Sequence, residues 1–418
     1  MARFEIIGPS KLSGKIRVAG SKNSVLPIMA ASLLTEEECT IENVPKISDV
    51  AVMAQLLEIC GAGVKGIGTA TLTITAKKLT EQSLPRELTE KLRASILLLG
   101  PLIARVGKVT MGFPGGDIIG RRSLDTHVQA LKSFGVKIEE VNDRITAYAD
   151  ELGGTWVFLQ EASVTATENA VMAAVLTKGE TVIKRAASEP HVVDLCNFLI
   201  KMGANIDGVA SNVLKIRGVE KLTGTSFKIR PDHIEAGTFA ILAAVTGSSV
   251  EISPVAKEDL DMILLILEQF GVRFSLEENT LKITGGKLKA VEKVVTDVWP
   301  GFPTDLMAPM IVLATQAQGA TLLHDWMYES RMFFVDKLLS MGAKVEIADP
   351  HRVLVYGPTK LRGQRLDTPD IRAGMALVIA ALAARGKSII DKAELIERGY
   401  EDIVERLSTL GAKITKRA

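Results

Sequence analysis

The chain has 418 residues and a formal net charge of +1, so no global field favours nucleic acid or an acidic membrane surface. Its longest apolar runs, such as residues 375–384, are about half the roughly 20 residues that a membrane span needs. The length allows two or three domains, and a composition that is 47% hydrophobic but only 5% aromatic predicts cores of small aliphatic side chains.

The three cysteines, Cys39, Cys60 and Cys196, have neither disulfide nor metal-ligand spacing. The first residues of the chain contain no apolar stretch of the signal-peptide type. We therefore expect a cytoplasmic protein with reduced thiols in its core, without a metal site or a cofactor. The sequence leaves the oligomeric state open.

One short pattern recurs six times along the chain. In each copy an apolar residue and a glycine are followed by Ala or Val and then by an apolar residue, after an amphipathic helical segment. The glycines are Gly61, Gly135, Gly203, Gly271, Gly342 and Gly411, and they are 74, 68, 68, 71 and 69 residues apart. Each glycine is predicted to end a helix and turn the chain into a strand. The near-constant spacing predicts six repeats of about 70 residues.

Each repeat also contains a second helical segment that is apolar on nearly all sides. These segments lie near residues 26–34, 94–104, 170–176, 236–245, 306–315 and 373–384. A helix without a polar face is buried. We therefore predict an α/β fold with about four short strands and two helices per repeat, sheets outside and helices inside. The repeats divide as three plus three, with a break near residues 229–232.

Polar residues precede each of these apolar helices. Asp232, Asp305 and Asp370 can be read as helix N-terminal caps. Cations at the positive end of a helix are electrostatically unfavourable, so Lys22, Arg93 and Arg372 favour a bound anion. Arg331 and Arg398 are further candidates, although the spacing alone favours solvated surface arginines.

A loop rich in glycine lies between a long apolar segment and an amphipathic helix. It spans residues 112–127, and its glycines and Pro114 exclude a helix or a central strand. Asp117 is therefore a carboxylate on a mobile loop, and the alternative is an ordinary solvated turn. The residues by themselves indicate a cleft between two three-repeat domains. It would bind a small, multiply charged anion through Lys and Arg, and the Asp117 loop would close over it.

Motifs spread over the chain resemble those of the UDP-N-acetylglucosamine 1-carboxyvinyltransferases, a family of enolpyruvyl transferases. The resemblance runs from Phe4 to Lys413. It is carried by Gly20-Ser21-Lys22-Asn23, Leu92-Arg93-Ala94-Ser95, Pro114-Gly115-Gly116-Asp117, Arg122-Ser123-Leu124-Asp125-Thr126-His127, Ala166-Thr167-Glu168-Asn169, Glu189-Pro190, Pro231-Asp232, Phe302-Pro303-Thr304-Asp305, Glu329-Ser330-Arg331, Asp370-Ile371-Arg372 and Arg398-Gly399-Tyr400.

The resemblance implies the family's fold, a two-domain inside-out α/β barrel. One domain would comprise residues 22–230 and carry the catalytic loop 112–123. The other would comprise residues 1–21 and 231–418. The implied reaction transfers the enolpyruvyl group of phosphoenolpyruvate to the 3′-hydroxyl of UDP-N-acetylglucosamine, by addition and elimination through a tetrahedral ketal. It releases phosphate and is the first committed step of peptidoglycan synthesis. The implied partners are these two substrates, with no nucleic acid and no membrane.

The family's site residues carry over by position. Lys22, Arg122 and Arg398 would hold the phosphate of phosphoenolpyruvate, and Arg331 and Arg372 its carboxylate. Asp305 would be the general base, and Asn23 would contact the sugar and the intermediate. The residues around the uridine diphosphate would be Arg93, Arg122, Ser123, Leu124, Asp125, Ser163, Val164 and Met327.

Asp117 stands where many members of the family have a cysteine that protonates the substrate's methylene carbon. An unperturbed Asp has a pKa of about 3.9 and is a poor acid at neutral pH. We expect burial under the closed loop and the charges of the substrates to make Asp117 an acid only in the complex. Without the thiol, the enzyme should be insensitive to fosfomycin.

Other positions depart from the family pattern, and two alternatives stay open. Glu161 replaces a lysine near the diphosphate, and Thr165, Ser123, His233 and Glu394 replace a common Gly, Pro, Arg and His. These changes concern nucleotide affinity and details of the sugar site. The alternatives are a transferase acting on shikimate 3-phosphate and a non-catalytic homologue that binds UDP-sugars.

Overall fold

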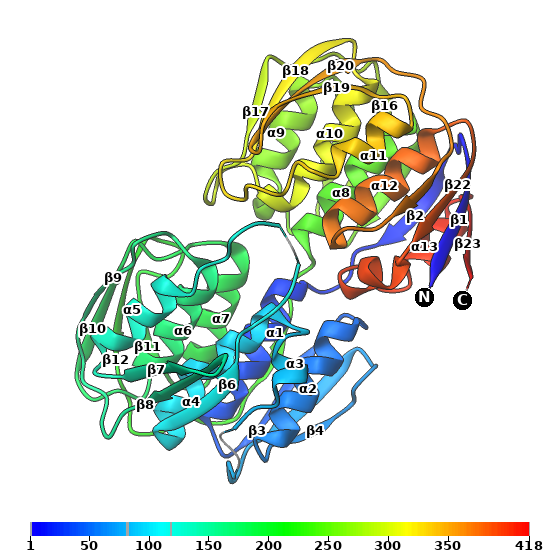
Figure 1. Cartoon of the computed structure of the whole chain (residues 1–418). Coiled ribbons are helices and arrows are strands. Elements are labelled where there is room, and N and C mark those ends of the chain that lie inside the picture. The colour runs from blue at the N-terminus through cyan, green and yellow to red at the C-terminus, as the bar shows by residue number, and fades with distance from the viewer. Residues whose placement is uncertain (1, 81–82, 118, 418) are drawn as a thin grey trace. The chain divides into compact units, whose positions relative to one another are not determined.

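The computed structural model describes residues 2–80, 83–117 and 119–417. The chain forms two compact units. The N-terminal unit comprises Gly20–Gly116 and Arg122–Arg230, and the C-terminal unit comprises Met1–Ala19, Asp117–Arg121 and Pro231–Ala418. Figure 1 shows both units, each built of helices with strands on their outer side.

The N-terminal unit has three sheets. Their strand orders are β13-β3-β5-β4, β6-β8-β7 and β11-β12-β10-β9. The strands are β3 (Glu38–Glu42), β4 (Gly63–Lys65), β5 (Thr71–Thr75), β6 (Lys108–Gly112), β7 (Lys137–Val141), β8 (Arg144–Tyr148), β9 (Trp156–Phe158), β10 (Glu180–Lys184), β11 (Asn205–Asp207), β12 (Val213–Arg217) and β13 (Ser226–Lys228). The helices are α1 (Lys22–Ala31), η1 (Ser32–Leu34), α2 (Ser48–Ile59), α3 (Arg86–Thr89), η2 (Arg93–Leu98), α4 (Leu99–Val106), α5 (Asp125–Ser133), α6 (Val164–Ala174) and α7 (Pro190–Lys201).

The C-terminal unit also has three sheets, and the first strand of the chain lies in one of them. The strand orders are β15-β16-β14-β2, β17-β18-β20-β19 and β21-β22-β1-β23. The strands are β1 (Arg3–Gly8), β2 (Ser13–Arg17), β14 (Ser249–Ser253), β15 (Val272–Glu277), β16 (Thr280–Gly286), β17 (Lys293–Val295), β18 (Gly319–His324), β19 (Lys344–Asp349), β20 (Arg352–Gly357), β21 (Arg365–Asp367), β22 (Gly386–Asp391) and β23 (Lys413–Arg417). The helices are α8 (His233–Val245), η3 (Lys257–Asp259), α9 (Asp261–Gln269), η4 (Thr304–Leu306), α10 (Met307–Gln316), α11 (Val335–Ser340), α12 (Ile371–Ala383), η5 (Ala393–Arg398) and α13 (Ile403–Thr409).

The six-repeat prediction is confirmed by the six sheets, three in each unit. Five of the sheets have four strands among the described residues. The sheet of β6, β7 and β8 has three, with an isolated parallel bridge from Ser83 to Thr110 in place of the fourth. All six repeat glycines adopt a positive φ, between 82° and 102°. Each therefore takes the left-handed conformation that ends its helix, as predicted.

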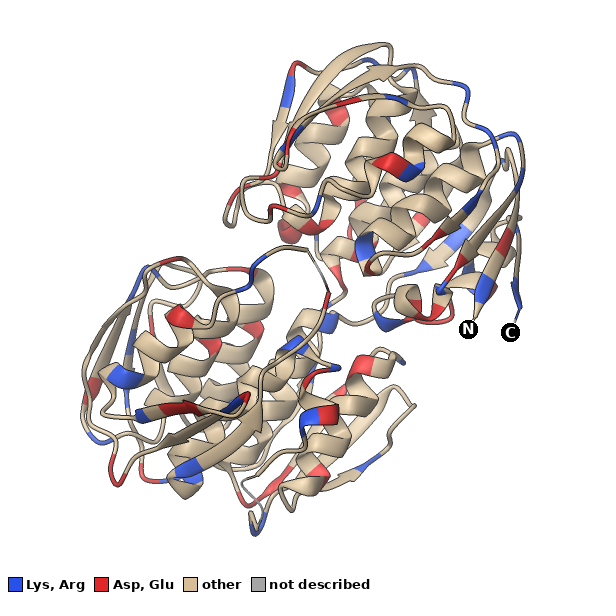
Figure 2. Cartoon of the chain, in the orientation of Figure 1, with Lys and Arg blue, Asp and Glu red and all other residues tan. Residues whose placement is uncertain are grey.

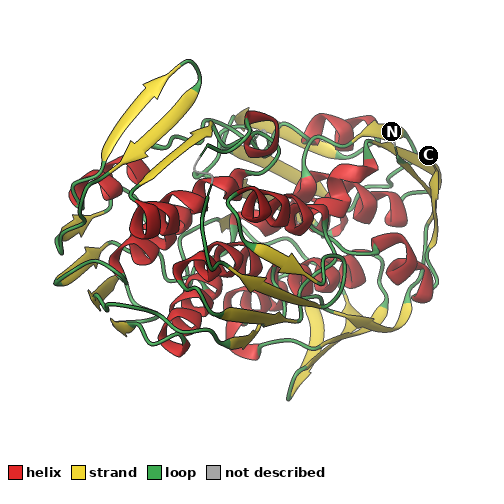
Figure 3. Ribbon diagram, turned by 90° about the horizontal axis from the view of Figure 1, so that it is seen from below, coloured by secondary structure: helices red, strands yellow, loops and turns green. Residues whose placement is uncertain are grey.

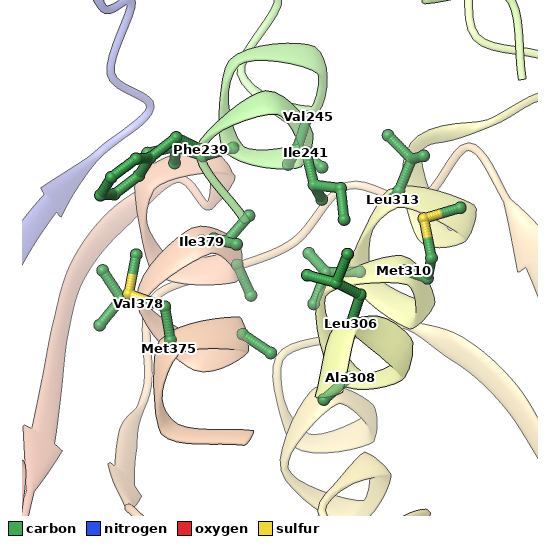
Figure 4. Close-up of a cluster of buried hydrophobic side chains, with 14 of the residues drawn as sticks. Phe239, Ile241, Val245, Leu306, Ala308, Met310, Leu313, Met375, Val378 and Ile379 are labelled. Carbon is green, nitrogen blue, oxygen red and sulfur yellow. The ribbon is translucent and has the colours of Figure 1, made fainter. Parts of the chain in front are cut away.

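The apolar helices form the interior of each unit. Every residue of α8 is buried, and only Ala383 of α12 is not fully buried. Figure 4 shows side chains of α8, α10 and α12, among them Phe239, Met310 and Ile379, in one buried hydrophobic cluster. Figure 3 shows strands outside these helices, and Figure 2 shows charges mostly on strands, loops and helix ends. The prediction of helices inside and sheets outside is confirmed, although α6 begins six residues before the expected 170 because the Ser163 side chain caps it.

Each four-stranded sheet has one parallel pair at an edge, and the rest of its pairing is antiparallel. β17 pairs in parallel with β18, and β21 with β22. A buried helix connects the two strands of each of these pairs. Because parallel strands have their carboxyl ends at the same edge, the residues before the helix and those after the second strand are brought together there. This topology places the polar residues described next.

Candidate active site

Four buried helices begin at a side-chain cap. Asp232 accepts hydrogen bonds from the backbone N–H groups of Ile234 (2.8 Å) and Glu235 (3.1 Å). Asp370 accepts them from Arg372 (2.8 Å) and Ala373 (3.0 Å). Ser21 caps α1 and Ser163 caps α6 in the same way. The capping interpretation therefore holds for Asp232 and Asp370.

Asp305 has a different role, because its carboxylate joins two buried arginines. One oxygen lies 3.1 Å from Nη2 of Arg331, and the other lies 2.9 Å from both Nε and Nη2 of Arg372. The arginine side chains are 3% and 5% exposed, whereas that of Asp305 is 26% exposed. Solvent therefore reaches the carboxylate but hardly reaches its two partners.

The two arginines remain cationic in this setting. Burial opposes the charge of Arg372, but the Asp305 carboxylate and the Tyr400 hydroxyl, 3.1 Å from Nη1, outweigh it and raise the pKa well above the usual range. Burial likewise opposes the charge of Arg331, and Asp305 raises the pKa of that group. Nε of Arg331 is buried and has no hydrogen-bond partner. This pair of arginines is suited to a bound carboxylate.

Asp117 is paired with Arg398 in the C-terminal unit. Its carboxylate lies 3.1 Å from Nη1 of Arg398, and both side chains are less than one fifth exposed. The residues after it are attached to the segment that leads to Arg331. Glu329 accepts a hydrogen bond from the backbone N–H of Arg121 (2.9 Å), and Ser330 N donates to Ile119 O (3.1 Å). Ile118, the next residue of the glycine-rich loop, lies outside the described residues.

In the N-terminal unit the predicted cations have protein partners. Lys22, the first residue of α1, lies 2.9 Å from a carboxylate oxygen of Asp49. Nη1 of Arg93 donates to Pro114 O (3.4 Å), and Nη2 donates to Arg122 O (2.7 Å) and Ser123 O (3.3 Å). A bound anion is therefore not needed to explain Lys22, Arg93 and Arg372, because the fold supplies counter-charges and acceptors. Arg93 instead joins the two ends of the glycine-rich loop.

The starts of α5 and α6 bring together most residues expected around the nucleotide. Ser123, Leu124 and Asp125 lie at the start of α5, and Ser163 and Val164 lie at the start of α6. His127 links the two helices, because Nε2 lies 3.0 Å from Thr165 Oγ1 and Nδ1 lies 3.0 Å from Asn169 Nδ2. Burial, followed by the charge of Arg93, lowers the pKa of His127 to about 3. Glu161 accepts a hydrogen bond from Thr126 (3.3 Å).

Asn23 and Met327 are the other two expected contacts of the nucleotide substrate. Asn23 follows Lys22 in the first turn of α1 and is half-buried. Met327 belongs to the C-terminal unit, where its backbone N–H donates to the Asp325 carboxylate (3.0 Å).

Sequence reasoning missed Asp49, Asp325 and Glu329 as partners of the candidate site. Asp49 and Asp325 have no local sequence signal, because each follows an ordinary polar or strand-end residue and makes its contacts through the fold. Glu329 stands inside a recognised motif, but only the structure connects it to Arg121. In the part of the chain that the structure describes, no cluster of three or more His, Cys, Asp or Glu side chains could hold a metal ion. Nor does any described helix have the length and apolarity to cross a membrane.

Comparisons with known proteins identify the family and the fold of this chain. The family model of EPSP synthase (3-phosphoshikimate 1-carboxyvinyltransferase) matches residues 6–407. The enolpyruvyl transferase NikO of Streptomyces tendae has the same fold, with a TM-score of 0.90 at 25% identity, covering 99% of this chain and 98% of NikO. EPSP synthase of Acinetobacter baumannii is 19% identical with a TM-score of 0.78 over the full length of both chains, which shows the shared fold.

The sequence relatives carry a narrower name. Proteins named UDP-N-acetylglucosamine 1-carboxyvinyltransferase are 47% identical in Treponema denticola, over 99% of both chains, and 48% identical in Bradyrhizobium diazoefficiens, over 99% of this chain and 98% of the relative. In Borreliella burgdorferi the identity is 46%, over 100% and 99%. The chain therefore belongs to the EPSP synthase family of carboxyvinyl transferases. It is a transferase with the two-domain enolpyruvyl transferase fold.

Proposed function

We propose that this protein transfers the enolpyruvyl group of phosphoenolpyruvate to the 3′-hydroxyl of UDP-N-acetylglucosamine and releases phosphate. The observation that carries this proposal is the full-length identity of 46–48% to relatives named for that transfer. The paired arginines beside Asp305 support it, since they are suited to a carboxylate-bearing substrate. The reaction would supply a precursor of peptidoglycan.

We assign Asp305 as the general base of the addition step. It takes the proton of the 3′-hydroxyl as that oxygen attacks C2 of phosphoenolpyruvate, and an acid delivers a proton to C3. The product is a tetrahedral ketal that still carries phosphate. Loss of a C3 proton and of phosphate then gives the enol ether. Arg331 and Arg372 hold the substrate carboxylate, and Lys22, Arg122 and Arg398 hold its phosphate.

The acid in this scheme is Asp117. In the structure its carboxylate is held by Arg398, so it is not placed as a proton donor. Phosphate binding to Arg398 would compete for that guanidinium and release Asp117. The loop carboxylate would therefore become an acid only when phosphoenolpyruvate is bound. The nucleotide would be contacted by Asn23, Arg93, Arg122 and Met327, together with Ser123, Leu124, Asp125, Ser163 and Val164 at the starts of α5 and α6.

Shikimate 3-phosphate as acceptor is less well supported. The family model has that specificity in its name, but the EPSP synthase structure is only 19% identical to this chain. The second alternative is a non-catalytic homologue that binds UDP-sugars. The buried arginine pair beside Asp305 argues against it.

Phosphate release decides between these functions. Purified protein with phosphoenolpyruvate and UDP-N-acetylglucosamine should release one phosphate for each enolpyruvyl product detected by mass spectrometry. The same protein with shikimate 3-phosphate should release none. Asp305→Ala should abolish release in the first mixture. Binding of UDP-N-acetylglucosamine without phosphate release would contradict the proposal and favour the non-catalytic alternative.

A further inference from the structure

Asp325 is a fully buried carboxylate just after the carboxyl end of β18, and it is not among the residues assigned to the proposed reaction. Its side chain is 0% exposed. Oδ1 accepts hydrogen bonds from the Thr296 hydroxyl (3.2 Å) and from the backbone N–H groups of Met327 (3.0 Å) and Tyr328 (3.4 Å). Oδ2 accepts a hydrogen bond from the Thr304 hydroxyl. A carboxylate can accept about four hydrogen bonds, and the Asp325 carboxylate accepts four.

These four donors lie on three separate stretches of chain. Thr296 follows β17, the parallel partner of β18. Thr304 opens η4 and immediately precedes Asp305. Met327 and Tyr328 begin the turn that leads to Arg331. The parallel pair brings the first and third stretches to the same edge of the sheet, and the carboxylate then ties the second to them.

The backbone around Asp325 is held as well. Its N–H donates to His351 O (2.8 Å), and its carbonyl oxygen lies 2.7 Å from Nδ1 of His351. The carboxylate therefore projects from a fixed backbone. A buried acceptor with fixed backbone and filled hydrogen bonds sets positions more sharply than a solvated contact does.

We propose that Asp325 is a positioning residue that fixes the general base Asp305 relative to Arg331. The inference rests on the proposed function, because it concerns the geometry of that reaction. Thr304 is the link to the base, and the Met327–Tyr328 turn is the link to the arginine. Asp325 thus holds both the stretch that carries Asp305 and the stretch that carries Arg331.

Thr304→Val tests the link to the base without touching either charged residue. It removes the hydroxyl that donates a hydrogen bond to Asp325 and keeps the shape of the side chain. We expect kcat to fall by about 10- to 100-fold, because a displacement of about 1 Å in a catalytic group has that effect. The KM for UDP-N-acetylglucosamine should change little. Thr304→Ser, which restores the hydroxyl, should restore kcat.

Thr321→Val is the matched control. Thr321 lies on β18, the strand that ends just before Asp325. It is 1% exposed, and its hydroxyl has no hydrogen-bond partner. This variant should keep the kcat of the wild type. A Thr304→Val enzyme with unchanged kcat, or one whose loss of activity follows only its loss of folded protein by circular dichroism, would overturn the inference. Absence of transfer by the wild type would instead overturn the proposed function.

Discussion

Asp305 and Arg372 are paired through two contacts of 2.9 Å to one carboxylate oxygen, although they lie 67 residues apart in the chain. Arg331 is bound to the other oxygen. The assigned base therefore occupies the guanidinium groups assigned to the substrate carboxylate. In the proposed reaction, a substrate carboxylate that binds both guanidinium groups competes with Asp305 for them. Displacement from either arginine would leave Asp305 free to accept the proton of the sugar hydroxyl.

Asp305→Asn should bind phosphoenolpyruvate more tightly while it loses activity. The variant lacks the internal anion that competes for both arginines, so we expect Kd to fall by about 10- to 150-fold, in line with about 1.5–3 kcal/mol for a charge-assisted hydrogen bond. The kcat should fall by about 10²- to 10⁴-fold with the loss of the base. Isothermal titration calorimetry measures the Kd. Asp336→Asn removes the same charge from an exposed position and should leave Kd unchanged. An equal or weaker affinity in Asp305→Asn would argue against the displacement.

Asp117 should set both the acid chemistry and the response to fosfomycin. The wild type should keep full activity after incubation with fosfomycin, because its three cysteines are buried and its loop has no thiol. Asp117→Cys should retain transfer and lose it with time in fosfomycin, with one adduct seen by mass spectrometry. Asp117→Asn should lose about 10²- to 10⁴-fold in kcat. Time-dependent inactivation of the wild type with an adduct would refute this prediction.

Gly115 should be required for the shape of the loop. A Cβ atom there would lie 1.6 Å from the backbone oxygen of Glu90 and 2.5 Å from its carbonyl carbon, and backbone atoms cannot move aside as a flexible side chain can. Gly115→Ala should therefore displace the loop and lower kcat by about 10- to 100-fold, with little change in melting temperature. Gly153→Ala is the control, since a Cβ atom at Gly153 meets nothing within 4 Å. Equal kcat values for the two variants would show that the loop tolerates the displacement.

His127 should make the free energy of unfolding depend on pH in the acidic range. Burial and Arg93 lower the pKa of this residue to about 3, whereas it is about 6.5 in the unfolded chain. Between these values only the unfolded state binds the proton, so stability should fall as the pH decreases, by up to about 1.4 kcal/mol per pH unit. Urea titrations from pH 7 to pH 4 should show a shallower loss in His127→Gln. Parallel pH profiles of the two proteins would count against a neutral buried imidazole.

Glu168 should act in the opposite direction. Its carboxyl group is buried, Oε1 has no hydrogen-bond partner, and burial followed by the charge of Glu189 raises its pKa well above the usual range. Above about pH 4.5 the unfolded chain loses this proton and the folded chain keeps it, so stability should fall as the pH rises. Glu168→Gln should remove that decline. Chemical denaturation between pH 5 and pH 8 checks it, and a variant that declines as steeply as the wild type would contradict it.

The repeat architecture could be read from the sequence because its signals are local and recur. A glycine after an amphipathic helix and an apolar helix without a polar face each follow from a few neighbouring residues, and six copies at one spacing leave little ambiguity. The loop that carries Asp117 could be located in the same way. The caps Asp232 and Asp370 were also open to prediction, because capping depends on residues two or three positions away.

The partners of the charged residues could be found only in the tertiary structure. Arg398 and Asp117 are 281 residues apart, and Arg372 and Asp305 are 67 apart, so no local pattern connects them. The sequence marked Lys22, Arg93 and Arg372 as cations in need of a partner, but the fold decided that Asp49, the loop carbonyls and Asp305 supply it. The physical reason is that helix and turn signals act over one or two turns of chain. Charge pairing depends on which distant strands and helices the packed core brings together.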